Sequence, residues 1–286
     1  METRTLGKTG LDVSRLGAGL AEMGSLTDVS VAGRLLNIAL DAGINFLDTA
    51  ACYGDSEVLI GKTVADRRDE YLLATKAGHV TGGYEGEAWT ATTIRDSIER
   101  SLERMRTDYV DLVQLHSCGV EILERGEVIQ ALLDAKRSGK VRFIGYSGDN
   151  EAARWAIESG HFDTLQTSFN LLDQGPLSDI LPKAEAAGMG IIIKRPIANA
   201  VWGNPEGSGR ETYRRRAQAI QAQGPIPEAP EDPIALALGF LLAHDEVDTA
   251  IVGTSDPDHM RENIEIVERD LPISPQAVEA LHRRYR

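Results

Sequence analysis

The sequence predicts an α/β fold, a single TIM-type (β/α)8 barrel with a parallel eight-stranded core. Short β-branched stretches alternate with amphipathic helical stretches eight times along the 286 residues. Strands that alternate with helices are joined by right-handed crossovers into a parallel sheet, and eight such units close naturally into a barrel. Because no linker-like segment divides the chain, we expect one domain over residues 1–286.

The expected strands are short apolar stretches that end at a polar residue or at glycine. Apolar runs of this length between turn signals are typical of strands buried on both faces, as in a parallel sheet. In chain order, the strands are expected at residues 13–20, 44–48, 71–76, 109–116, 141–147, 163–169, 189–194 and 249–253.

The expected helices follow the strands and repeat apolar residues at helical spacing. The clearest is 91–106, where Ile94, Ile98, Leu102 and Met105 share one face. The others are expected at residues 29–43, 56–64, 126–140, 151–160, 177–188, 232–244 and 256–268, with a last helix at 274–286.

A long polar loop is expected from about Ala198 to Glu231. Its Gly/Pro/Glu-rich part, residues 203–233, lies inside one strand–helix unit and indicates a large loop over the barrel mouth. Loops of this length are either substrate lids or mobile surface segments, and both interpretations stay open.

The composition excludes several classes of partner. The formal net charge is −14, from 44 acidic residues against 30 Lys and Arg, and such a surface repels nucleic acid and anionic lipid. The chain has no apolar run near the roughly 18 residues of a membrane helix, and its polar start lacks the apolar centre of a signal peptide. We therefore expect a cytoplasmic protein that acts on a small molecule.

The cysteines and histidines do not predict a metal site. The two cysteines, Cys52 and Cys118, cannot form a disulfide framework or a four-thiolate site, and the histidines lack metal-ligand spacing. The cysteines flank Tyr53 and His116 in the sequence. They lie either near the barrel mouth or, as small thiols more commonly do, in the packed interior.

Polar residues close the predicted strands, and in a barrel of this kind the carboxyl ends of the strands converge on one face. Asp48, Lys76 and His116 end three consecutive strands, and Tyr53 follows in the loop after the first of these. Taken singly, an acid at a strand end is usually a helix cap, a lysine is usually solvated and a histidine is often a structural hydrogen bonder. Together they would put four chemically useful groups at one mouth.

The four groups suit proton transfer to a carbonyl oxygen. A free tyrosine has a pKa near 10, and a nearby ammonium favours the phenolate and lowers that pKa. Asp48 would keep Lys76 charged and in place, and Lys76 would tune Tyr53 as a general acid. His116 would hydrogen-bond the reacting oxygen or relay a proton. Such a site can protonate the oxygen while a hydride reaches the carbon.

The stretches around these residues resemble the aldo-keto reductase family. They occur in the family's order, cover nearly the whole chain and are specific in combination. The resemblance implies the eight-stranded barrel and an NAD(P)H-dependent oxidoreductase that reduces an aldehyde or ketone to an alcohol, or the reverse. It places the catalytic tetrad on Asp48, Tyr53, Lys76 and His116. The matching stretches are INFLDTAACYGDSE, LLATK, DYVDLVQLH, IGYS, LQTSFN and GTSDPDHMREN.

The resemblance also implies where the nicotinamide end of the cofactor binds. Ser147 and Gln166 stand where the family hydrogen-bonds the nicotinamide carboxamide, although Gly148 replaces the asparagine that often follows the serine. Lys194 stands where the family usually stacks an aromatic ring on the nicotinamide. Trp202 is either a substitute for that ring or only a pocket wall.

The adenine end is expected at the last strand and the helix after it. Backbone N–H groups at a helix N-terminus bind phosphate. Asp256 either caps this helix or faces the ribose, where it would favour NADH, and Arg261 lies nearby. On family habit, NADP(H) is slightly favoured over NAD(H). The residues expected to contact this end are Gly253, Thr254, Ser255, His259, Glu262 and Asn263.

Other functions and folds are compatible with parts of the sequence. A barrel of this family can be a cofactor-binding regulatory subunit with little turnover. The chain could also be another barrel enzyme, such as a metal-dependent hydrolase. The stretch GAGLAE, residues 17–22, half resembles a dinucleotide-binding fingerprint, but Glu22 takes the place of the third glycine, so a Rossmann domain is not expected. Trp89 and Met23 are either pocket walls or ordinary packing residues.

Overall fold

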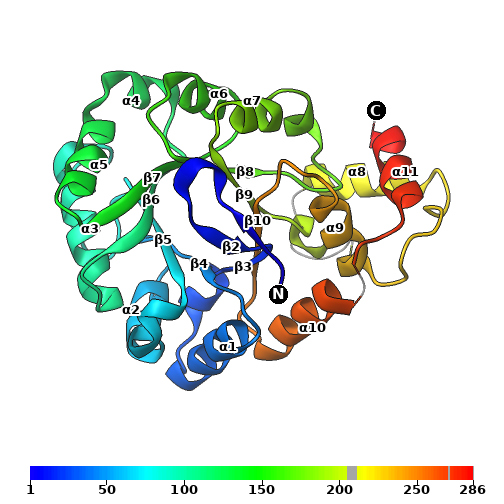
Figure 1. Cartoon of the computed structure of the whole chain (residues 1–286), viewed down its shortest axis with the longest axis horizontal. Helices are drawn as coiled ribbons and strands as arrows, with labels where there is room; N and C mark the ends of the chain where they lie inside the picture. Colours follow the sequence, from blue (N-terminus) through cyan, green and yellow to red (C-terminus); the bar gives the residue numbers. More distant parts are fainter. Residues whose placement is uncertain (205–210, 270, 286) are drawn as a thin grey trace.

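The strands form the predicted barrel. The computed structural model describes residues 1–204, 211–269 and 271–285. Eight parallel strands close on themselves in the order β10-β3-β4-β5-β6-β7-β8-β9 (Figure 1). They are β3 (Leu16–Gly19), β4 (Phe46–Asp48), β5 (Leu72–Ala77), β6 (Val110–His116), β7 (Val141–Ser147), β8 (Thr164–Ser168), β9 (Gly190–Lys194) and β10 (Thr249–Gly253).

The helices surround the barrel and cover its outer face (Figure 1). In the described part of the chain, no helix is both long and apolar enough to cross a membrane. The α-helices are α1 (Val29–Asp41), α2 (Ser56–Thr63), α3 (Ala91–Met105), α4 (Val120–Arg125), α5 (Glu127–Arg137), α6 (Asn150–Ser159), α7 (Ile180–Ala186), α8 (Glu211–Gln221), α9 (Pro233–Leu242), α10 (Pro257–Arg269) and α11 (Pro275–Tyr285).

The first predicted strand, residues 13–20, is wrong as a single element. Its start belongs to β2 (Asp12–Ser14), which pairs antiparallel with β1 (Thr3–Thr5), and the barrel strand begins only at Leu16. Arg15 separates the two because its buried guanidinium donates to the carbonyl oxygen of Leu242 over 2.7 Å and to that of Val247. A continuous apolar pattern could not show this change of direction.

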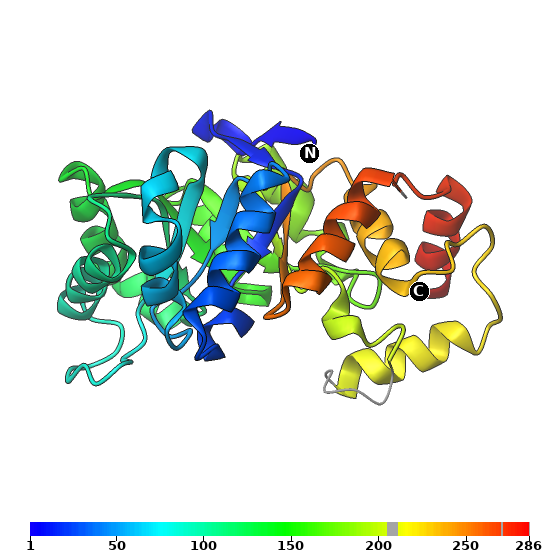
Figure 2. The same cartoon turned by 90° about the horizontal axis from the view of Figure 1, so that it is seen from below.

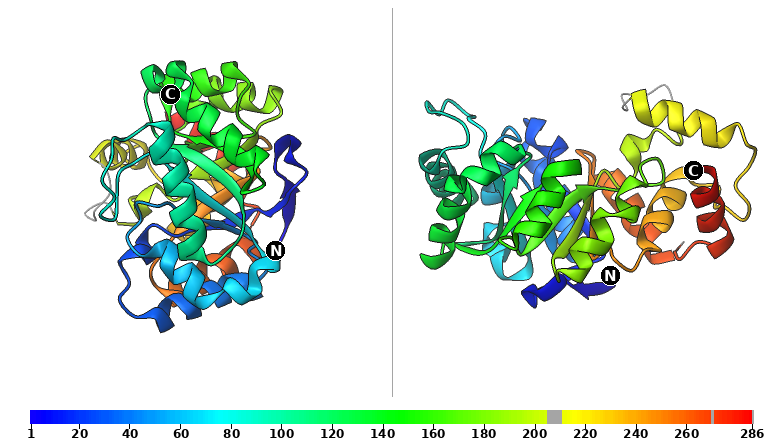
Figure 3. Two further views of the ribbon diagram at one scale, coloured as in Figure 1. Left: turned by 90° about the vertical axis from the view of Figure 1, so that its left-hand side faces the viewer. Right: turned by 90° about the horizontal axis from the view of Figure 1, so that it is seen from above.

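The hairpin closes the amino-terminal end of the barrel. Leu6, Leu11 and Val13 pack with inward-facing side chains of five barrel strands in a cluster of buried residues, which includes Phe46, Ala74, Leu112, Ile192 and Ile251. Figures 2 and 3 show the hairpin on one face of the molecule, and α8 and the loop between β5 and α3 on the opposite face. The end with the hairpin is therefore plugged, and the carboxyl ends of the strands face the other way.

The predicted loop from Ala198 to Glu231 is also partly wrong. It contains a short 3-10 helix, η5 (Ala198–Ala200), and the helix α8, while its residues 205–210 lie outside the described residues. In α8, Tyr213, Ala217 and Ile220 are buried at helical spacing. This narrow apolar stripe is hidden in the sequence among arginines and glutamines, which dominate the average hydropathy of the segment.

A close approach of α2 and α3 gives a prediction about stability. A Cβ atom at Gly61 of α2 would lie 2.1 Å from the backbone oxygen of Arg104, whereas one at Gly33 of α1 would meet only the Thr63 methyl at 3.5 Å. We expect Gly61→Ala to lower the free energy of unfolding by about 1–3 kcal/mol, because the added methyl group would force the backbone of α3 to shift away from α2.

The matched control is Gly33→Ala. It adds the same methyl group in ordinary contact, and we expect it to stabilise the protein by up to about 1 kcal/mol through helix propensity. Urea unfolding of the two variants measures both values. Equal stabilities for the two would contradict the close packing of α2 on α3.

Candidate active site

The carboxyl ends of the barrel strands surround a cavity of about 290 Å³. This end of the barrel lies opposite the hairpin (Figure 2). Asp48, Tyr53 and His116 of the predicted tetrad line it, and the fourth member, Lys76, is buried in contact with Asp48. The other polar residues of the lining include Ser147, Gln166, Lys194 and Arg195, and Gly253 lies at its edge.

A buried ion pair lies at the base of the cavity. The ammonium of Lys76 is 2.5 Å from Oδ1 of Asp48 and donates to the carbonyl oxygen of Thr49 over 2.9 Å. Lys76 and Asp48 are only 2% and 1% exposed. Oδ2 of Asp48 accepts from the amides of Gln114 and Gln166, at 3.1 and 2.8 Å. The carboxylate is therefore satisfied on both oxygens, as a buried charge must be.

Tyr53 lies over this pair. The Lys76 nitrogen is 4.8 Å from the centroid of the Tyr53 ring. Burial raises the pKa of the Tyr53 hydroxyl above its ordinary value, and the positive charge of Lys76 opposes this without cancelling it. The net pKa of Tyr53 therefore lies above the ordinary value rather than below it. Lys76 acts in the expected direction, but the loss of phenolate hydration raises the pKa by more than the ammonium lowers it.

His116 stands beside Tyr53 as a neutral ring. The two rings meet edge to face with centroids 5.6 Å apart, and Nδ1 of His116 is 3.3 Å from Sγ of Cys52. Burial, together with the positive charges of Lys76 and Lys194, lowers the pKa of His116 to about 3. At neutral pH the imidazole therefore offers one N–H and one lone pair rather than a charge.

Ser147 and Gln166 are joined to the ion pair by a chain of hydrogen bonds. The Ser147 hydroxyl donates to Oε1 of Gln166 over 2.9 Å, and Nε2 of Gln166 donates to Asp48. These bonds fix which end of the amide is which, because a carboxylate can only accept. The replacement of asparagine by Gly148 has a steric reason, since a Cβ there would lie 2.4 Å from the hydroxyl oxygen of Tyr146.

Lys194 occupies the wall of the cavity at the end of β9. Its nitrogen lies 3.3 Å from Oδ2 of Asp149, and its side chain is 14% exposed. Burial lowers the pKa of Lys194 to about 8, against the opposing attraction of Asp149. Arg195 lies next to it and donates to the hydroxyl of Ser168 over 2.6 Å. Trp202, considered above as a substitute stacking ring, lines a separate hollow beside Gln221.

The predicted adenine-end residues lie at the turn between β10 and α10. Thr254 accepts a hydrogen bond from the backbone N–H of Asp256 over 3.0 Å. The Asp256 carboxylate accepts from the N–H of Asp258 over 2.8 Å, so the capping alternative for Asp256 is the one observed. Of the remaining expected residues, Ser255 lies in the turn, His259 and Glu262 are exposed on α10, and Asn263 is buried.

The family model for the Aldo/keto reductase family matches residues 15–283. The chain belongs to the aldo-keto reductase family. It is 31% identical to L-galactose dehydrogenase of Arabidopsis thaliana over 93% of this chain and 88% of that protein. It is 25% identical to an NADH-specific methylglyoxal reductase of Escherichia coli, over 98% and 97%.

The solved structures agree with this membership. An aldo-keto reductase from Bacillus halodurans, in its holo form, superposes with a TM-score of 0.87 at 29% identity, over 99% of this chain and 96% of that one. The protein is therefore an oxidoreductase of the aldo-keto reductase family with the family's TIM barrel.

Several residues that contact side chains lining the cavity are not evident in the sequence. Gln114 lies two positions before His116 on β6, hence on the same face of the strand, and this spacing was a readable signal. Asp149, which pairs with Lys194, lies just past the end of β7 and resembles an ordinary turn residue. The contact of Cys52 with His116 and the ring of His79, whose centroid is 5.1 Å from that of His116, depend on loop conformation.

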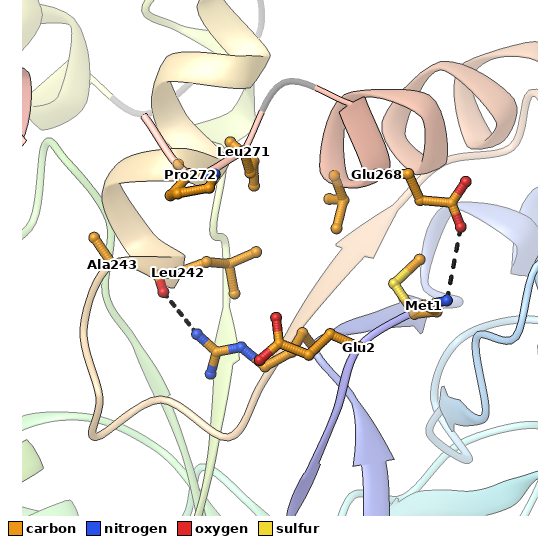
Figure 4. Close-up of a pocket in the computed structure, with 10 residues that line it drawn as sticks. Met1, Glu2, Leu242, Ala243, Glu268, Leu271 and Pro272 are labelled. Atoms are coloured by element: carbon orange, nitrogen blue, oxygen red, sulfur yellow. Dashed lines mark hydrogen bonds and ion pairs between the residues drawn. The ribbon is translucent and has the colours of Figure 1, made fainter. Parts of the chain in front are cut away.

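Another cavity, of about 480 Å³, lies near the amino terminus of the reductase (Figure 4). Arg15 lines it, but its guanidinium is already bound to main-chain oxygens, including that of Leu242. The terminal amine of Met1 pairs with Glu268 over 3.7 Å. These groups tie the start of the chain to α9 and α10.

The buried pair predicts strong energetic coupling between its two partners. We expect Asp48→Asn and Lys76→Met each to lower the free energy of unfolding by about 3–5 kcal/mol, because each leaves the other charge buried without its partner. The double variant removes both charges, so its loss is expected to be clearly smaller than the sum. Urea unfolding of the four proteins gives the coupling. Additivity to within about 0.5 kcal/mol would contradict the pairing.

Proposed function

We propose that the protein reduces an aldehyde or ketone to an alcohol with a nicotinamide cofactor, and catalyses the reverse oxidation. The observation that carries the proposal is the phenol of Tyr53 beside a buried ammonium and a neutral imidazole, all at one cavity. A phenol supplies a proton, an ammonium stabilises the phenolate that remains, and an imidazole binds the reacting oxygen. Acyl transfer or phosphoryl transfer would not require this set.

The cavity also fits the cofactor. The amide nitrogen of Gln166 donates to Asp48 and its oxygen accepts from Ser147, which leaves the second lone pair of that oxygen for a hydrogen bond from a carboxamide. The wall carries the cations Lys194 and Arg195, which suit a pyrophosphate. The turn after Gly253, at the end of the cavity, leads into the N-terminus of α10, and the positive end of that helix dipole suits a phosphate.

In the proposed mechanism the bound nicotinamide supplies the hydride. Tyr53 donates its proton to the carbonyl oxygen as the carbon is reduced. Lys76, held charged by Asp48, stabilises the resulting phenolate until it takes a proton from solvent. His116 donates a hydrogen bond that holds the carbonyl oxygen near Tyr53. A raised pKa is compatible with this role, because an alkoxide is far more basic than a phenolate.

We further propose that NADP(H) is used slightly better than NAD(H). The Asp256 carboxylate is engaged by the backbone of Asp258, which lessens its repulsion of a 2′-phosphate. Arg261, which is exposed in the same part of α10 and pairs with Asp258, offers a cation near it. The second candidate function is a cofactor-binding regulatory subunit with little turnover. The assembled tetrad favours the enzyme, because a cofactor-binding subunit would not need a buried lysine beside a phenol.

Tyr53→Phe tests the function directly. We expect the variant to bind NADPH and NADH as the wild type does, with NADPH somewhat tighter, in a fluorescence titration. We expect aldehyde reduction to fall at least about 100-fold, the contribution typical of general acid catalysis. Steady-state consumption of NADPH with a panel of aldehydes and ketones measures it. Near wild-type turnover in Tyr53→Phe would overturn the mechanism, and cofactor binding without turnover in the wild type would favour the regulatory subunit.

The pH dependence follows from the pKa shifts. Burial holds the pKa of His116 at about 3 and raises that of Tyr53 above its ordinary value near 10. Each therefore keeps one protonation state between about pH 5 and 7, and reduction with saturating cofactor should be level there. Above about pH 10 reduction should fall as Tyr53 loses its proton, while alcohol oxidation should rise. If the rate of reduction changed with an apparent pKa near 6.5, the neutral state of His116 would be contradicted.

A further inference from the structure

The thiol of Cys52 touches the imidazole of His116. Its Sγ lies 3.3 Å from Nδ1, within hydrogen-bonding distance for sulfur. Among the described residues, this thiol is the one hydrogen-bond partner of the His116 ring. Nδ1 is therefore occupied, and Nε2 is the nitrogen left to meet a ligand in the cavity that His116 lines.

A cysteine beside a histidine is also the arrangement of a nucleophilic dyad, and the surroundings decide against that role. An activated thiol exists as a thiolate paired with an imidazolium. Burial raises the pKa of the Cys52 thiol and lowers that of His116 to about 3. The nearby ammonium groups of Lys76 and Lys194 further oppose a second cation on the ring. The pair is therefore neutral, a thiol beside an imidazole.

The neutral pair can form its hydrogen bond in two directions. Either the S–H of Cys52 donates to a bare Nδ1, or Nδ1–H donates to the sulfur. Sulfur is a weak acceptor, whereas an unprotonated imidazole nitrogen is a good one. The first direction uses this acceptor and leaves the proton of the ring on Nε2, where it can be donated to a ligand in the cavity. The hydrogen bond made by one ring nitrogen thus sets the state of the other.

The neighbouring rings fix the plane of His116 but not its tautomer. Tyr53 and His79 meet it edge to face, at centroid distances of 5.6 and 5.1 Å. Edge-to-face contacts restrict tilt and position. They do not distinguish a protonated from an unprotonated nitrogen, so that choice falls to Cys52.

We propose that Cys52 is a positioning residue that holds His116 in the Nε2–H tautomer, so that the ring donates to the carbonyl oxygen of the substrate. Its catalytic consequence rests on the proposed carbonyl reduction. With the other tautomer, a lone pair on Nε2 would face the lone pairs of that oxygen and repel it. The loop after β4 would then position both hydrogen-bond donors of the carbonyl oxygen. It carries Tyr53 itself, and it carries Cys52, which holds His116.

Nitrogen-15 NMR of histidine-labelled protein at pH 7 reads the tautomer without substrate or cofactor. We expect the wild-type His116, assigned by comparison with His116→Asn, to show a protonated Nε2 and an unprotonated, hydrogen-bonded Nδ1. Cys52→Ser keeps a donor and should preserve this pattern. Cys52→Ala should shift the Nδ1 resonance as the bond is lost and the tautomers mix. A protonated Nδ1 in the wild type, or unchanged shifts in Cys52→Ala, would overturn the proposal.

Kinetics give the second readout. We expect Cys52→Ala to lower kcat about threefold to tenfold, as the fraction of competent tautomer and its alignment fall, with KM for the cofactor unchanged. Cys52→Ser should recover most of this loss. The matched control is Cys118→Ala, which removes the other thiol, buried in the main hydrophobic core, whereas the thiol that bonds His116 is that of Cys52. A loss in Cys118→Ala equal to that in Cys52→Ala would contradict the assignment.

These two readouts separate the inference from the function. If the wild type reduced no carbonyl compound, the proposed function would fail while the NMR pattern would still decide the tautomer. If the wild type reduced carbonyls and its Nδ1 carried the proton, only the role of Cys52 would fail.

Discussion

The ion pair between Lys76 and Asp48 is the interaction on which the rest of the cavity depends. Two charges that are almost inaccessible to solvent meet at 2.5 Å inside the barrel. Burying them is costly, and the cost is offset only because Asp48 is also satisfied by two glutamine amides. Those amides come from β6 and β8, so the pair ties β4 and β5 to the neighbouring strand β6 and to β8 across the barrel. Its position at the carboxyl ends of the strands, opposite the plugged end, is what leaves room for a ligand above it.

The same burial sets the character of the groups above the pair. It keeps Tyr53 protonated and His116 uncharged, while Lys76 stays charged because Asp48 is in contact with it. In water these residues would differ little from free amino acids. Here a donor, a neutral hydrogen bonder and a fixed cation stand within a few ångströms of one another. The proposed carbonyl reduction depends on a protonated Tyr53, a neutral His116 and a charged Lys76. The role proposed for Cys52 depends on the neutral state of His116.

Much of this was predictable from the sequence, for a physical reason. A parallel sheet buried on both faces shows as apolar runs, and the residue that ends each run must lie at the barrel mouth, so the positions of Asp48, Lys76 and His116 followed from strand boundaries alone. The hairpin β1–β2 and helix α8 did not follow, because a bend at Arg15 and a narrow apolar stripe among arginines leave no clear pattern. The net upward shift of the Tyr53 pKa did not follow either, because it depends on how much water is excluded, which no spacing of residues records. The contacts of Gln114 and Cys52 require side-chain geometry.

The most direct measurement is the titration of Tyr53 itself, by carbon-13 NMR of the labelled tyrosine ring, assigned with Tyr53→Phe. The account predicts that the wild-type hydroxyl titrates above pH 10 and that Lys76→Met moves it higher still, because burial would then act without the opposing ammonium. A Tyr53 that titrates at the same pH in Lys76→Met, or at a lower one, would show that the buried lysine does not act on the phenol.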